Sequence, residues 1–144
     1  ILATSEHERY DCVFVTRFED AHRYSSAERL GVDDSEVTGA ESAPLVLEYK
    51  YDLDGLIADF ESEKKFPRDV DLLVCWTMGN TYRDSFNLKS YLWGEEGSVR
   101  GLYGVTHALY REREKILEIV CLKDLLGYLR DPEATAGEQR VKYP

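Results

Sequence analysis

The sequence lacks the features that mark several large classes of protein. No apolar run approaches the roughly 18 residues that a membrane-spanning helix needs, and no signal-peptide pattern opens the chain. Nucleotide-binding glycine loops of the GxGxxG or GxxxxGKS/T type are absent, as is the GxSxG elbow of serine hydrolases. We therefore expect neither a membrane protein nor an ATPase nor a serine hydrolase.

Cysteine and histidine are also scarce, at three residues each. The cysteines lie inside apolar runs and form no CxxC pair: Cys12, Cys75 and Cys121. An odd count at such positions predicts reduced thiols in the core of a cytoplasmic protein. The histidines are scattered, so a zinc site is not expected, and we interpret His107, inside an apolar strand, as a core or edge histidine.

The size and charge of the chain set further bounds. A length of 144 residues with 43% hydrophobic residues is typical of one globular domain. The formal net charge of −10 argues against a free-standing, nonspecific nucleic-acid binder, which normally carries a basic excess. Because the chain opens on Ile1 rather than Met, we expect it to be a domain of a longer polypeptide.

Two strands are predicted in the N-terminal half. Residues 11–18 alternate β-branched and aromatic side chains, which is typical of a strand. Residues 19–43 are acidic and are interpreted as an insertion, with a short helix around 26–30 ended by Gly31. The second strand, 45–51, follows Pro44 and places Glu48 and Lys50 on one face and Tyr49 on the other.

A helix and a third strand follow. Residues 52–65 carry apolar side chains at helical spacing, with Asp52 as the expected N-cap and Lys64 and Lys65 suited to the C-terminal end. Residues 70–78 are almost continuously apolar, as in a strand covered on both faces. A strand–helix–strand unit of this length predicts that the second and third strands are parallel.

The C-terminal half is predicted to complete the same domain. Residues 79–104 are interpreted as a long loop with short elements, 105–110 and 116–121 as a hairpin, and 122–130 as a helix stopped at Asp131-Pro132. Residues 1–132 would form the domain (core 11–78, C-terminal strands and helix 105–130), and residues 133–144 a polar tail. Six aromatic residues are expected mostly in core packing, with base stacking as the alternative: Trp76, Tyr82, Phe86, Tyr91, Trp93 and Tyr103.

The acid-x-lysine triplet Glu48-Tyr49-Lys50 carries the functional hypothesis. A carboxylate and an ammonium side by side on a half-buried strand cost desolvation, which indicates a site. The segments LVLEYK, LDGLIADFESEKK and VDLLVCW resemble, in this order, the core of the PD-(D/E)XK nuclease superfamily. The resemblance covers about half of the chain and implies a restriction-endonuclease-like α/β fold, a mixed sheet with a β-β-α-β core flanked by helices.

The resemblance also implies a metal site. Asp11 and Glu48 would bind Mg²⁺ or Mn²⁺, with the backbone carbonyl of Tyr49 as a third ligand, and Lys50 would orient the attacking water. The spacing of the strands departs from the family, and no proline precedes Asp11. Four other acids therefore compete for the first position, with Asp33 the next choice: Asp20, Asp33, Asp34 and Glu36.

The function that follows is a Mg²⁺-dependent DNA endonuclease-type domain of a larger prokaryotic DNA-processing or defence protein. The expected partners are DNA, bound through the parent protein, other domains of that protein and a second copy of the chain; no membrane is expected. The alternative is a catalytically inactive nuclease-like fold that serves as an interaction or dimerisation module. A weaker third hypothesis is an acidic mimic of nucleic acid.

Overall fold

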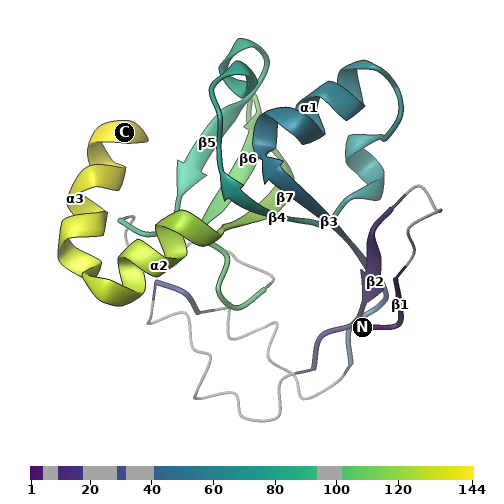
Figure 1. Ribbon diagram of the computed structural model, residues 1–144, viewed down its shortest axis with the longest axis horizontal. Coiled ribbons are helices and arrows are strands. Elements are labelled where there is room, and N and C mark those ends of the chain that lie inside the picture. Colours follow the sequence, from purple (N-terminus) through teal and green to yellow (C-terminus); the bar gives the residue numbers. More distant parts are fainter. Residues whose placement is uncertain (5–9, 18–28, 32–40, 94–101) are drawn as a thin grey trace.

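The chain folds into a mixed α/β structure (Figure 1). The computed structural model describes residues 1–4, 10–17, 29–31, 41–93 and 102–144. Its elements in chain order are β1 (Ala3–Thr4), β2 (Cys12–Phe14), β3 (Leu45–Asp52), α1 (Leu53–Glu61), β4 (Leu72–Thr77), β5 (Asn87–Ser90), β6 (His107–Arg111), β7 (Glu114–Cys121), α2 (Leu122–Arg130) and α3 (Pro132–Lys142). Two short 3₁₀ helices, η3 (Pro67–Asp69) and η4 (Thr81–Asp84), flank β4.

All described strands join one mixed sheet in the order β1-β2-β3-β4-β7-β6-β5. The centre is parallel, with β4 paired to both β3 and β7, whereas the pairs toward either edge are antiparallel. The predicted parallel pairing of the second and third strands is confirmed. The predicted hairpin is confirmed as the antiparallel pair β6 and β7.

Helix α1 begins where the sequence predicts. Asp52 is its N-cap, and the Asp52 carboxylate accepts a hydrogen bond from the N–H of Gly55 at 2.8 Å. Leu53, Leu56 and Ile57 are buried against the sheet. The helix ends at Glu61, however, so the expectation that it runs to Lys65 was wrong, and both lysines at its predicted end lie in the turn that follows.

The N-terminal strand is shorter than predicted. β2 covers Cys12–Phe14, whereas the prediction was 11–18, of which position 18 lies outside the described residues. Among the described residues beyond Phe14 the pairing with β3 ends, and an isolated bridge between Arg17 and Glu41 follows. The predicted helix around 26–30 lies mostly outside the described residues, and only its last positions, 29–30, are seen, in a turn. Asp33 and its acidic neighbours also lie outside the described residues.

Residues 133–144, expected to be a polar tail, instead form α3 and the segment after it. Asp131 ends α2 and also caps α3 by accepting the N–H of Ala134 at 3.1 Å, with Pro132 at the first helical position. Gln139 of α3 reaches the sheet, where its Oε1 accepts a hydrogen bond from the Ser90 hydroxyl at 2.7 Å and lies 2.8 Å from His107 Nε2. The tail is therefore part of the packed domain.

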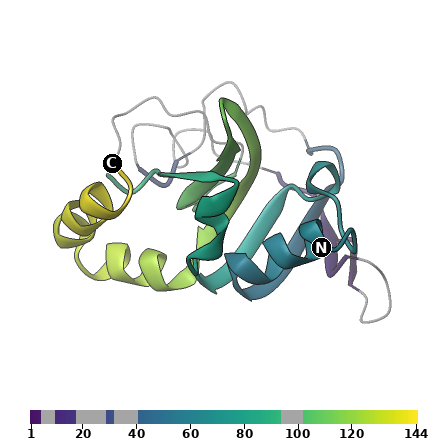
Figure 2. The ribbon, with the colours of Figure 1, turned by 90° about the horizontal axis from the view of Figure 1, so that it is seen from above.

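The core divides into two clusters. One packs α1 and the residue Tyr143 beyond α3 against Leu73, Ile119 and their neighbours in the sheet; the other gathers around Leu72, Tyr91 and Val105. Figure 2 shows the three α-helices along one side of the molecule. All three cysteines are buried and not in disulfides, as predicted.

The predicted role of the aromatic residues is confirmed in part. Tyr82, Phe86 and Tyr91 are buried, and His107 is a wholly buried core residue, as expected. Trp76 and Tyr103 are exposed. No helix in the described part of the chain has the length and apolar character to cross a membrane.

Candidate acid–lysine site

Glu48 is the most deeply placed acid of the candidate site. The alternation of β3 directs Glu48 and Lys50 toward α1 and turns Tyr49 to the opposite face, as the sequence predicts. The Glu48 side chain is 0% exposed. A carboxylate at such a position must be paired or neutralised, because an isolated buried charge is very costly.

Asp11 and Glu48 meet across the junction of β2 and β3. The backbone N–H of Asp11 donates to Glu48 Oε1 at 3.0 Å, and the backbone N–H of Tyr49 donates to Asp11 Oδ2 at 2.9 Å. Each carboxylate is thus held by the strand that carries the other. The pairing of Cys12 with Leu47 brings Asp11 opposite Glu48, so the two predicted ligands are brought together.

Two lysines and a third acid complete the arrangement. Lys65 donates to Glu48 Oε2, and its Nζ is also 3.7 Å from Asp59 Oδ2. The Nζ of Lys50 is 2.7 Å from the same Asp59 oxygen. We name these five residues the acid–lysine cluster: Asp11, Glu48, Lys50, Asp59 and Lys65.

Burial and ion pairing shift the pKa values of these groups in opposite directions. Burial raises the pKa of Glu48, and the hydrogen bonds from Lys65 and from the Asp11 N–H offset only part of that rise. Burial would lower the pKa of Lys50, but the bond to Asp59 and the nearby carboxylates outweigh it and raise the pKa. For Asp59, burial is outweighed by the bond to Lys50 and by the charges of three nearby lysines, so its pKa is lowered.

Two members of the cluster were not predicted from the sequence. Asp59 lies on α1 three residues after Leu56, so it shares the buried face of the helix; an acid at that spacing was the available signal. Lys65 was expected only to balance the helix dipole, and no local pattern marks its contact with Glu48, 17 residues away. The direct ion-pair partner of Lys50 is Asp59, and its predicted role toward a water or a phosphate stays a prediction.

The donor set is compatible with a hard divalent cation. The cluster contains three carboxylates and two ammonium groups, which leaves one negative charge in excess. Mg²⁺ is commonly held by one or two carboxylates and keeps several waters, so Asp11 and Glu48 are chemically sufficient. Among the described residues, no group of three or more His, Cys, Asp or Glu side chains is placed to hold a metal ion.

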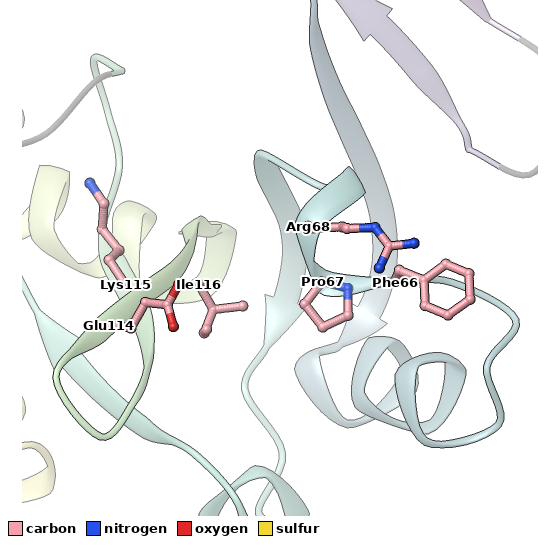
Figure 3. Close-up of a pocket in the computed structure, with 6 residues that line it drawn as sticks. All are labelled: Phe66, Pro67, Arg68, Glu114, Lys115 and Ile116. Atoms are coloured by element: carbon pink, nitrogen blue, oxygen red, sulfur yellow. The ribbon is translucent and has the colours of Figure 1, made fainter.

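A first pocket is not lined by the cluster. Its volume is about 260 Å³, and it lies between the turn Phe66–Arg68 and the start of β7 (Figure 3). Its lining mixes the basic side chains of Arg68 and Lys115 with the acidic side chain of Glu114. None of the five cluster residues lines it, so we do not assign the site there.

A second, shallower pocket of about 410 Å³ lies at the carboxyl ends of β3 and β4. Four of its lining residues are large, apolar or aromatic, and exposed. One of them, Leu122, begins α2, and that helix carries two further exposed leucines at helical spacing, Leu126 and Leu129. We name these six residues the apolar face: Tyr49, Tyr51, Trp76, Leu122, Leu126 and Leu129. Large apolar side chains that stay exposed in such numbers commonly mark an interaction site.

The fold and site together define a mixed α/β protein with a buried acid–lysine cluster at the junction of an antiparallel strand pair and a strand–helix–strand unit. Comparison with known proteins found no matching family model, no matching curated protein and no matching solved structure.

Proposed function

We propose that this chain is a Mg²⁺- or Mn²⁺-dependent phosphodiesterase domain of the DNA endonuclease type, with a restriction-endonuclease-like fold. Its setting would be a larger prokaryotic DNA-processing or defence protein. The observation that carries the proposal is the meeting of Asp11 and Glu48, from adjacent strands, beside two lysines in a mostly buried cluster. The order β2, β3, α1, β4, with β3 parallel to β4, supports the same reading.

Each residue has a role that follows from its chemistry. Asp11 and Glu48 would hold the metal, with the Tyr49 carbonyl as a proposed third ligand. Bound there, the metal would stabilise charge on a phosphate and acidify a coordinated water. Lys50, whose pKa is raised, stays protonated at neutral pH and would offset phosphate charge or orient a water. Asp59 would act through Lys50 as a positioning residue.

The proposal is tested by metal binding and by cleavage, measured on the same variants. Mn²⁺ and Mg²⁺ binding would be followed by calorimetry, and plasmid nicking would be followed in the parent protein. Glu48→Gln and Asp11→Asn should each abolish both signals. Asp71→Asn is the matched control, because Asp71 Oδ2 also accepts a backbone N–H of β3, from Val46 at 2.8 Å, but lies outside the cluster.

The control separates loss of a ligand from loss of a strand contact. If Asp71→Asn abolishes binding as fully as Asp11→Asn, the effect comes from weakened β3 rather than from a site. Metal binding that is absent from the wild-type parent protein would refute the proposal. Binding that depends on Glu48 but not on Asp11 would instead place the first acid elsewhere, with Asp33 the next candidate.

A second candidate function is a protein-interaction or dimerisation module, and the apolar face favours it. Tyr51, Leu126 and Leu129 are each more than half exposed although they are large and apolar. The variant Tyr51→Ser/Leu126→Ser should then abolish association, with either a second copy or another domain, in sedimentation velocity. Retained association in that variant, with Lys123→Ser as a control on the exposed side of α2, would argue against this function.

A further inference from the structure

The lysine that contacts Glu48 is not the lysine of the acid-x-lysine triplet. Lys50 is tied to Asp59, whereas Lys65 donates to Glu48 Oε2, the carboxylate oxygen that is not bonded to the Asp11 N–H. The Glu48 side chain is 0% exposed and that of Lys65 is 13% exposed. The positive charge that neutralises the buried acid therefore comes from outside β3.

A hydrogen-bonded turn after α1 brings Lys65 next to Glu48. After α1 ends, Glu63 adopts a left-handed conformation with φ of 57°, which is uncommon for a residue with a side chain. The N–H groups of Lys64 and Lys65 then both donate to the carbonyl of Asp59, at 3.0 and 3.2 Å. The turn returns the chain toward β3, and the Lys65 side chain extends from it to Glu48.

A divalent ion and the Lys65 ammonium would contact Glu48 in different ways. A divalent ion would need direct contact with the carboxylate oxygens, as hard cations do. The Lys65 ammonium holds one of these oxygens and carries a positive charge, which opposes the approach of a second cation. A lysine on a flexible four-carbon stem can move away without a change in the sheet, whereas Asp11 and Glu48 are fixed by backbone hydrogen bonds.

We propose that Lys65 is a built-in cation of the site, which neutralises Glu48 in the metal-free protein and competes with a divalent ion for that carboxylate. This inference rests on the proposed metal site and adds its regulation. Lys65 keeps the buried acid paired while no metal is bound, and it weakens the intrinsic metal affinity. Lys65 acts as a counter-charge to Glu48 and is not itself a metal ligand.

The experiment measures Mn²⁺ binding by calorimetry and the Mn²⁺-induced rise in melting temperature, neither of which depends on cleavage. Lys65→Met removes the competing charge and should tighten Mn²⁺ binding by about tenfold or more, because like charges within a few ångströms interact strongly at low dielectric. Lys65→Arg keeps the charge and should bind as the wild type does. Lys64→Met is the matched control, since it makes the same change in net charge on an exposed neighbour and should stay within about twofold.

A second variant keeps the test valid if Lys65→Met does not fold. Lys65→Gln retains a hydrogen-bond donor for Glu48 without the charge, and it should also tighten Mn²⁺ binding. If the wild type binds Mn²⁺ and neither Lys65→Met nor Lys65→Gln binds more tightly, the competition is refuted while the metal site stands. Weaker binding in both would likewise refute it. If the wild type shows no binding that Glu48→Gln removes, the proposed function itself fails and the inference falls with it.

Discussion

Acid should destabilise this protein through His107. The imidazole is 0% exposed, its Nδ1 is 2.8 Å from Thr106 Oγ1, and its Nε2 is 2.8 Å from Gln139 Oε1. Burial lowers the pKa of His107 to about 4 from its ordinary 6.5, although Asp124, with Oδ2 at 3.6 Å, pulls in the opposite direction. The folded state therefore holds this histidine neutral, and the unfolded state protonates it first.

The sign and size of the change in unfolding free energy follow from the linkage between protonation and folding. A group whose pKa is depressed on folding contributes stability above its unfolded pKa, and that stability is lost as the pH falls toward the folded pKa. With pKa values of 6.5 unfolded and about 4 folded, the window runs between those two values. Going from pH 7 to pH 5 should lower the free energy of unfolding by about 2 kcal/mol through this one group.

The assay is urea unfolding at pH 7, 6 and 5, with His107→Gln as the reference. The variant cannot titrate at this position, so the difference in pH slope between the two proteins isolates His107 from the carboxylates. The wild type should lose about 2 kcal/mol more than the variant over this range. Equal slopes would refute the reasoning, whatever the variant's stability at pH 7.

Three further predictions concern stability. In metal-free protein, Lys65→Met should cost about 3 kcal/mol in urea unfolding, because Glu48 becomes a buried unpaired carboxylate; adding Glu48→Gln should recover part of this, and a purely additive double variant would contradict the pairing. Gly79→Ala should lower the melting temperature, since Gly79 has φ of 75° and an added Cβ would lie 2.1 Å from Asp54 Oδ2; a compensating Asp54→Ala that fails to relieve the clash would count against this. Asp131→Ala should cost about 1 kcal/mol by removing the cap of α3, measured as an earlier loss of helical circular dichroism than in Glu133→Ala.

The central part of the fold was predictable because its signals are local. The alternation of β3, the Asp52 cap and the apolar run of β4 each determine their own element, and a crossover of this length favours parallel pairing. Helix α3 was missed because its buried residues are Thr135, Ala136 and Gln139, which give no apolar period. Asp131-Pro132 was interpreted only as a stop, although an N-cap followed by Pro is also a start signal.

The site was predictable only where its residues share a strand pair. Glu48 and Lys50 lie on one face of β3, and Asp11 begins the strand beside it, so sequence order was enough to propose them. The contacts of Asp59 and Lys65 depend on where α1 ends and how the following turn returns, and those depend on tertiary packing. Spacing alone placed Glu48 and Lys50 on one face of β3, but it could not show that Lys65 pairs with Glu48 and that Asp59 pairs with Lys50.

The reciprocal bonds between Asp11 and Glu48 also bear on how the protein tolerates change in its sequence. In most hairpins a short turn sets which residues face one another, but here residues 15–44 separate β2 from β3. The side-chain-to-backbone bonds at Asp11 and Glu48 fix that alignment from within the strands. The two ends of the connecting segment extend the alignment, since Arg17 bridges Glu41 and the N–H of Ser42 donates to the carbonyl of Thr16 at 2.8 Å. We therefore expect that a change in the length of the segment between residues 17 and 41 leaves the two acids side by side.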